Sequence, residues 1–270
     1  MAAVASLAFA TVSAQPGPRI GGGTLHARAT VQTVAVSASR ATLLVTLQVD
    51  PGWHVSWRNP GETGLPTRLT WSLPTGVTVL RETWPVPVVA HTSVGATHTL
   101  EGDIPWLVQF AVDGATTQDR LATLTVKYGV CRDVCIPEQL MVQAALPGTA
   151  SARPVAVPAA LASRLARPGG TVPARRIGPT VLCLERVVGA TGAALPEIIA
   201  DSGSGIDAAL PLRSRQGMAL GSALVTIPAD ARFGRPGGVD GPVSVLFVRG
   251  RVGVEAALDF RARAPRCDRA

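Results

Sequence analysis

Apolar and polar residues alternate in short runs along the first half of the chain, which is the pattern of half-buried β-strands. Clusters of Asp, Asn, Gly and Pro separate these runs, and the polar stretch from Ala90 to Gly102 is expected to be a loop. The pattern predicts strands at residues 30–37, 41–49, 53–57, 68–73, 77–84, 104–112, 121–130 and 139–145. Short strands at this spacing predict an all-β fold, with a β-sandwich over residues 30–146.

The composition changes between residues 147 and 170, where Ala, Pro and Arg accumulate. We expect a linker here, with a short helix at residues 159–166. All five Trp residues precede this stretch. The chain of 270 residues is long enough for two domains, and residues 171–270 have their own strand candidates at 181–188, 219–227, 243–249 and 252–260. They predict a second, smaller β-domain.

The N-terminal segment, residues 1–14, is apolar and ends in the small residues Val12-Ser13-Ala14. This is typical of a signal peptide with its cleavage site, and the alternative is a buried N-terminal segment. No later stretch reaches the roughly 18 apolar residues of a membrane span. We therefore expect a soluble protein, not membrane-spanning, in an exported and oxidising compartment where disulfides persist.

The formal net charge of +7 raises the question of nucleic-acid binding. The Arg residues are scattered singly, apart from Arg175-Arg176 and a loose group near the C-terminus. No basic helix and no interleaved aromatic residues are evident. We therefore predict a soluble basic surface and no nucleic-acid partner.

Four cysteines provide the candidate chemistry and allow three pairings. Cys131 and Cys135 are separated by three residues, whereas Cys183 and Cys267 bracket most of the second domain. The economical pairing gives each domain its own disulfide. We expect Cys183–Cys267 to be structural, because closing so long a loop stabilises the fold by about 4–5 kcal/mol.

The Cys131–Cys135 pair has two interpretations. Closing about five residues restricts the unfolded chain little, so such a bond is a weak staple. Strained or exposed disulfides are the labile ones, which favours redox chemistry over an inert staple. Pro137 makes a helix through the motif unfavourable, so a helix-borne Cys-x-x-Cys of the thioredoxin type is not expected.

A metal site is the rival chemistry, because the two thiols together with His54, His91 or His98 are ligands for zinc or copper. The chain has no second cysteine pair near the motif and no His-x3-His spacing. We therefore predict no metal, while copper or zinc handling and a non-catalytic immunoglobulin-like binding module stay open as alternatives. Thiol–disulfide exchange itself needs no cofactor.

Several motifs in order resemble the N-terminal periplasmic domain of DsbD-type thiol:disulfide interchange proteins, in particular the ScsB-like variant. The resemblance covers roughly residues 30–146, and it weakens after residue 170. The motifs are Pro51-Gly52-Trp53-His54, residues 57–66 (WRNPGETGLP), Trp71-Ser72-Leu73-Pro74, Trp84-Pro85-Val86-Pro87 and residues 130–138 (VCRDVCIPE).

The resemblance implies an immunoglobulin-like sandwich with a redox-active cysteine pair. It implies that Cys135 forms the mixed disulfide with a partner and that Cys131 resolves it. In this family a cap loop shields the pair, and the stretch with His91 and His98 is the candidate here. The partners implied are periplasmic thioredoxin-like or disulfide-bearing proteins. The sequence contains neither the membrane domain nor the thioredoxin-like domain of the family, so the electron donor is expected to be a separate membrane protein.

Overall fold

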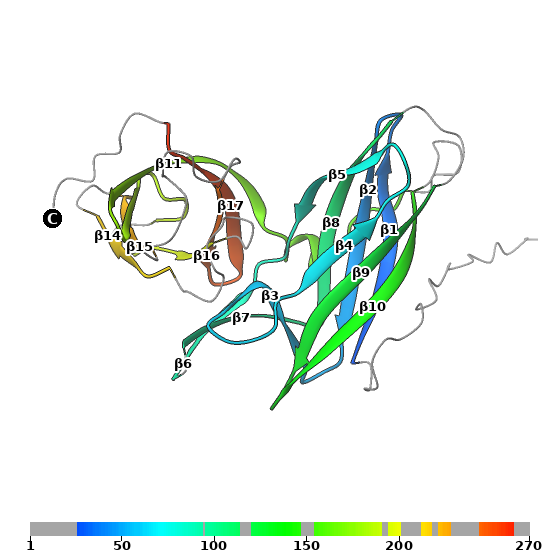
Figure 1. Cartoon of the computed structure of the whole chain (residues 1–270), viewed down its shortest axis with the longest axis horizontal. Coiled ribbons are helices and arrows are strands. Elements are labelled where there is room, and N and C mark those ends of the chain that lie inside the picture. The colour runs from blue at the N-terminus through cyan, green and yellow to red at the C-terminus, as the bar shows by residue number, and fades with distance from the viewer. Residues whose placement is uncertain are drawn as a thin grey trace, which may run out of the picture.

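The computed structural model describes residues 26–93, 95–113, 120–146, 154–190, 194–200, 212–217, 221–227 and 243–261. Nearly all of the regular structure in these ranges is β-strand, and the one helix among them is the short α1 (Ala159–Ala162). The all-β prediction is therefore confirmed. Figure 1 shows two lobes side by side, with the N-terminal half of the chain forming the larger one.

Two sheets form the first lobe. One has the strand order β1-β2-β8-β5, and the other has the order β10-β9-β3-β7-β6, with β4 also pairing with β9. The bounds are β1 (Ala27–Val36), β2 (Arg40–Val49), β3 (His54–Gly61), β4 (Arg68–Ser72), β5 (Val77–Thr83), β6 (Val88–Thr92), β7 (Gly95–Glu101), β8 (Asp103–Val112), β9 (Arg120–Cys131) and β10 (Cys135–Leu146). This arrangement is the expected immunoglobulin-like sandwich.

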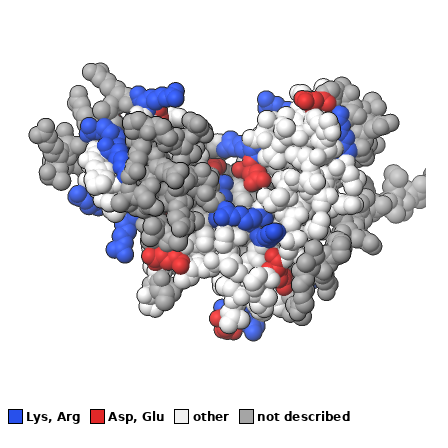
Figure 2. Space-filling view, viewed as in Figure 1, with Lys and Arg blue, Asp and Glu red and all other residues white. Residues whose placement is uncertain are grey.

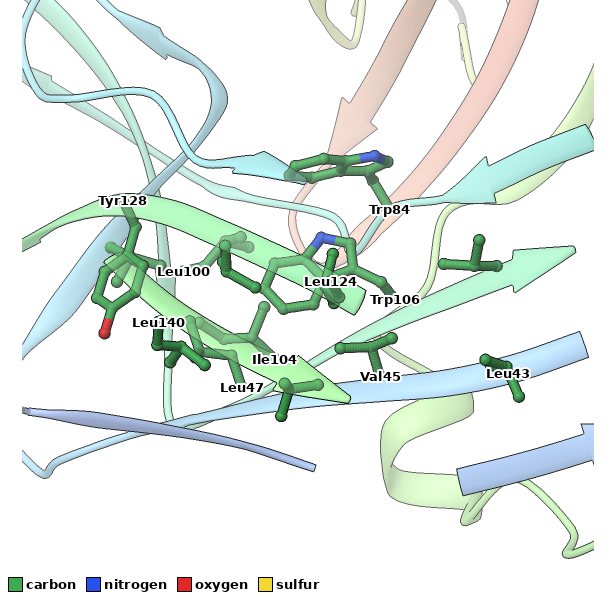
Figure 3. Close-up of a cluster of buried hydrophobic side chains, with 14 of the residues drawn as sticks. Leu43, Val45, Leu47, Trp84, Leu100, Ile104, Trp106, Leu124, Tyr128 and Leu140 are labelled. Atoms are coloured by element: carbon green, nitrogen blue, oxygen red, sulfur yellow. The ribbon is translucent and has the colours of Figure 1, made fainter. Parts of the chain in front are cut away.

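The core of the sandwich follows from strand alternation, which sends every second side chain to the same face. Leu43, Val45 and Leu47 of β2 are fully buried in this way (Figure 3). Trp106 lies above them in the same cluster, and its ring meets that of Trp84 edge to face at 5.6 Å. Side chains of this size cost about 3–5 kcal/mol to truncate to Ala, so the core holds the two sheets together firmly.

The second lobe is one rolled sheet of seven strands, in the order β13-β16-β17-β11-β12-β15-β14. A bridge between Ile198 and Leu212 brings its two edges together, so the sheet curls round on itself (Figure 1). The bounds are β11 (Arg167–Gly178), β12 (Val181–Leu184), β13 (Glu197–Ala200), β14 (Ser214–Gln216), β15 (Ala223–Thr226), β16 (Val243–Arg249) and β17 (Val252–Asp259).

The connection between the lobes is bound to the first lobe. Val86 N–H donates to the Arg164 carbonyl at 2.8 Å, and Ala166 N–H donates to the Trp84 carbonyl at 2.9 Å. The strand β11 then begins at Arg167, inside the range that composition marks as linker. The Pro and Gly residues that suggested a linker belong to this strand, where a Cβ on Gly169 would come within 2.8 Å of the Glu255 carbonyl oxygen.

Four expectations about the bounds of elements are wrong. The stretch from Ala90 to Gly102 is no loop, because β6 and β7 form an antiparallel hairpin within it. The strand expected at residues 53–57 continues to Gly61, and β10 begins at Cys135 instead of residue 139. The helix expected at 159–166 ends at Ala162. The predicted signal peptide, residues 1–14, lies outside the described residues.

Candidate functional site

Cys131 and Cys135 form a disulfide that closes the tip of the β9–β10 hairpin. The two residues are direct partners in the strand register, and the turn between them has a hydrogen bond of 3.2 Å from Arg132 N–H to the Val134 carbonyl. Pro137 sits within β10, which is an edge strand, where the loss of a backbone donor is tolerated. The hairpin therefore presents the disulfide at one end of the sandwich.

The two sulfur-bearing residues differ in exposure. Cys131 is 3% exposed, whereas Cys135 belongs to the exposed class. The Cys131 Sγ atom lies 3.7 Å from the Gly129 carbonyl oxygen. An attacking thiolate from another protein therefore has direct access to Cys135 only.

The loop before β4 covers the strand beside Cys131. A Cβ on Gly129 would lie 2.6 Å from the Leu65 Cβ, so Leu65 packs directly on this glycine. Residues two apart on a strand share a face, so the Leu65 contact is on the face that carries Cys131. The loop is held at its base by the Thr67 hydroxyl, which donates to the Ser56 carbonyl at 2.6 Å. Leu65 was not singled out from sequence, where it is one more residue of a turn-rich stretch.

A buried acid–phenol pair lies on the opposite face of the same hairpin. The Tyr128 hydroxyl donates to Glu138 Oε2 at 2.9 Å, and these residues are cross-strand partners. Burial, and then the neighbouring carboxylate, raise the pKa of Tyr128 well above its ordinary value. Tyr128 stands at one end of the core cluster, with its hydroxyl directed away from it (Figure 3). The phenol stays protonated and holds the Glu138 carboxylate in place.

An aromatic and charged stack flanks the turn. The His26 and Trp53 rings are parallel at 3.9 Å, and the Arg132 guanidinium lies 4.9 Å from the Trp53 ring. His26 also contacts the Asp50 carboxylate at 3.3 Å. Trp53 also packs partly against the core. Its other contacts fix Arg132 next to the disulfide.

The two histidines expected in a cap loop are far from the disulfide in the sheet register. Glu101 of β7 lies opposite His54, which lies opposite Cys131. His91 pairs with Ala96, which is five residues before Glu101 on β7. His91 therefore lies roughly 17 Å along the strand direction from the row that contains Glu101, His54 and Cys131. His98 lies roughly 10 Å from this row along β7. The structure thus brings Cys131 and Cys135 together and places His91 and His98 elsewhere.

Both histidines lie at the junction between the lobes. The exposed His91 contacts the Glu197 carboxylate of β13 at 3.2 Å. The buried His98 donates from Nδ1 to the Asn59 carbonyl at 2.8 Å, and burial lowers its pKa below the ordinary value. The two residues, with Glu62 and Glu197 among others, line a cavity of about 620 Å³ between the lobes.

The motif Arg58-Asn59 forms the main polar link across the junction. The Arg58 guanidinium contacts Glu255 of β17 at 2.8 Å and lies over the rings of Trp57 and Trp84. The Asn59 side chain donates to the Ala200 carbonyl of β13 at 2.8 Å. These residues of the sequence motif therefore anchor the second lobe, a role that the sequence did not indicate.

Cys183 is fully buried on β12, packed with Leu224 and Val181. Its expected partner, Cys267, lies outside the described residues, so the pairing stays a prediction. Among the residues that the structure describes, no three His, Cys, Asp or Glu side chains form a group suited to a metal ion. No helix in the described ranges is long and apolar enough to cross a membrane.

Charged side chains on the face shown in Figure 2 are spread over both lobes, with Lys and Arg interrupted by acidic and uncharged residues. A continuous basic track of the kind that follows a phosphate backbone is not seen on this face.

The comparisons with known proteins agree with this geometry. Residues 24–147 match the family model described as "Thiol:disulfide interchange protein DsbD, N-terminal". This part of the chain is a DsbD-type N-terminal domain. Thiol–disulfide interchange is therefore the chemistry of the family to which the sandwich belongs.

Among solved structures, the N-terminal periplasmic domain of ScsB from Proteus mirabilis is similar over 91% of this chain and 98% of that chain, with a TM-score of 0.52 and 18% identity. The similarity extends the shared fold across both lobes. The GAE domain of GGA2p from Saccharomyces cerevisiae covers 49% of this chain and 98% of its own, at 9% identity and a TM-score of 0.32, which is too low to carry an argument. No curated protein matches the chain.

Proposed function

We propose that this protein performs periplasmic thiol–disulfide exchange through Cys131 and Cys135. It would accept electrons from a separate membrane reductase and pass them to periplasmic disulfide-bearing or thioredoxin-like proteins. The observation that carries this proposal is the unequal exposure of the two cysteines at the hairpin tip of a DsbD-type domain. An inert staple does not need one exposed sulfur, whereas an exchange site does.

The exchange uses the two cysteines in fixed order. In the reduced protein, the Cys135 thiolate attacks a partner disulfide, and one partner sulfur leaves as a thiolate. The Cys131 thiolate then attacks Cys135 Sγ, so the mixed disulfide breaks and the second partner sulfur leaves. The Cys131–Cys135 bond forms again, two electrons pass to the partner, and the donor reverses these steps.

The reduction potential of the Cys131–Cys135 pair tests the proposal. We expect a value above about −300 mV, measured by equilibration with glutathione or thioredoxin and quantified at the peptide that contains both residues. The Cys183→Ser/Cys267→Ser variant, if folded, should give the same reduction potential for the Cys131–Cys135 pair in the absence of the other two cysteines. A value below about −300 mV would assign the bond a structural role and leave the non-catalytic binding module as the better account.

A further inference from the structure

A row of side chains crosses the sheet at the level of the disulfide. Glu101 of β7 lies opposite His54 of β3, His54 lies opposite Cys131 of β9, and Cys131 lies opposite Cys135 of β10. Directly opposite residues in antiparallel strands share a face, with Cβ atoms about 4.5–5.5 Å apart. The four side chains therefore stand side by side in the order carboxylate, imidazole, buried sulfur and exposed sulfur.

The face that carries this row is the one turned away from the sandwich core. Val55 and Val130, which follow and precede His54 and Cys131, pair with each other and are fully buried in the core. Alternation then places His54 and Cys131 on the outer face. Leu65 packs on Gly129 of the same face of β9. It therefore shields Cys131 from solvent on the side toward the middle of β9. His54 is therefore the titratable residue directly opposite the buried cysteine on the β3 side of β9.

We infer that His54 is the acid–base partner of Cys131 and that Glu101 positions His54. This inference rests on the proposed exchange function and adds a third participant to it. Cys131 is buried, so water has little access to its sulfur, and a neighbouring group must take or supply its proton. An imidazole can do both, because it changes charge near neutral pH.

The proton transfers complete the exchange steps. When Cys131 attacks the mixed disulfide, its thiol proton passes to the His54 imidazole as its sulfur bonds to Cys135 Sγ. In the reverse direction, a donor thiolate attacks Cys135 Sγ, and the S–S electron pair leaves on Cys131. The Cys131 sulfur then takes a proton from the His54 imidazolium. Atoms and electrons balance without a further reactant.

The neighbours of His54 in the sheet fit this role. Glu101 faces it from β7, so its carboxylate lies on the side of the imidazole away from Cys131. The Arg164 guanidinium donates to the Glu101 carbonyl at 2.7 Å and so holds that end of β7. Arg132 follows Cys131 in the turn, and its guanidinium is paired with the Asp133 carboxylate at 3.2 Å, so these two charges largely offset each other near the thiol. The residues facing His54 from the two neighbouring strands are therefore an acid on one side and the thiol on the other.

Alkylation of single thiols tests the inference without any partner protein. In the Cys135→Ser background, the rate at which iodoacetamide modifies Cys131 is followed from pH 5 to 10 by peptide mass spectrometry. We expect His54→Gln to slow this reaction about tenfold at pH 7 and to remove the inflection due to the imidazole from the pH profile. Glu101→Gln should slow it about threefold, since it acts through His54.

The matched controls separate chemistry from folding. In the Cys131→Ser background, the alkylation of Cys135 should change less than about twofold on His54→Gln, because Cys135 is one strand further away. His91→Gln, which removes an exposed histidine from the junction, should leave the Cys131 profile unchanged. An unaltered Cys131 profile in His54→Gln, or equal slowing of both thiols, would overturn the inference. The reduction potential reports separately on the exchange function, so either idea can fail alone.

Discussion

The hairpin tip and the junction between the lobes are built on the same strand but differ in chemistry. At the tip, His54 begins β3 beside a disulfide with one exposed sulfur. At the junction, Arg58 and Asn59 of the same strand are tied to the second lobe by an ion pair and an amide hydrogen bond. One end of β3 is left accessible for a partner, and the other is occupied within the chain. The difference implies that substitutions of the tip cysteines alter reactivity, whereas substitutions of Arg58 or Asn59 alter stability.

Substitution of either tip cysteine should have the largest effect, a loss of exchange activity, because exchange needs both sulfur atoms. Cys135→Ser should abolish transfer to a disulfide substrate, since the remaining thiol is buried. Cys131→Ser should instead accumulate a mixed disulfide at Cys135, because no thiol is left to resolve it. Non-reducing gel electrophoresis and mass spectrometry after mixing with a disulfide-bearing protein distinguish the two variants. Equal trapping by both would contradict the assigned order.

Loss of the Arg58 side chain should be the largest stability effect at the junction. Arg58→Ala leaves Glu255 partly buried without its nearest cation, and we expect a loss of about 3 kcal/mol in the free energy of unfolding. Denaturant unfolding followed by Trp fluorescence measures it. Arg81→Ala is the control, since Arg81 approaches the same carboxylate only to 4.0 Å from an exposed position and should cost less than about 1 kcal/mol. The single-thiol alkylation rates should not change.

The sequence predicted the sandwich because alternation is strong where one face is buried. The run that became β9 alternates clearly, and in β2 and β8 every second residue on one face is apolar and buried in the core. The β6–β7 hairpin was missed because its residues are polar and its burial depends on the junction. His98, for example, is buried and donates a hydrogen bond to the Asn59 carbonyl. The alternation of apolar and polar residues does not predict this contact.

The site was predictable in part for a similar reason. Cysteine spacing placed Cys131 and Cys135 together, because neighbours in sequence are neighbours in a hairpin. His54 and Leu65 reach the same place only through the pairing of β3 with β9 and the fold of the loop before β4. Such contacts come from distant parts of the chain. A single sequence shows the residues but not the register that joins them.

The Tyr128–Glu138 pair provides a stability test at the tip. Tyr128→Phe removes the one hydrogen bond to Glu138 Oε2, and Glu138 Oε1 already has no partner among the described residues. We expect a loss of about 1–2 kcal/mol, because a buried carboxylate is left unsatisfied. Adding Glu138→Gln should recover part of the loss by removing the charge. If Tyr128→Phe cost nothing in denaturant unfolding, the carboxylate would have to be solvated, and the tip would be more open than described.

The smallest expected effect is a pH dependence of the free energy of unfolding that arises from His98 at the junction. Burial lowers the pKa of His98, although the hydrogen bond to the Asn59 carbonyl and the Glu197 carboxylate act in the opposite direction. The unfolded chain therefore binds a proton at His98 as pH falls through about 6.5, while the folded protein does not until lower pH. The stabilisation from His98 is thus fully present above pH 6.5 and declines below it, by at most about 1.4 kcal/mol per pH unit.

Denaturant unfolding at pH 8, 7, 6 and 5 measures this slope. His98→Asn retains a donor for the Asn59 carbonyl and should flatten the dependence below pH 6.5. His91→Asn is the control from the same hairpin, since His91 is exposed and contacts only the rim carboxylate of Glu197 among the interactions described. It should not flatten the decline below pH 6.5 as His98→Asn does. A parent protein whose stability falls as steeply as that of His98→Asn would show that the acid sensitivity originates elsewhere. The junction would then contribute to stability without responding to pH.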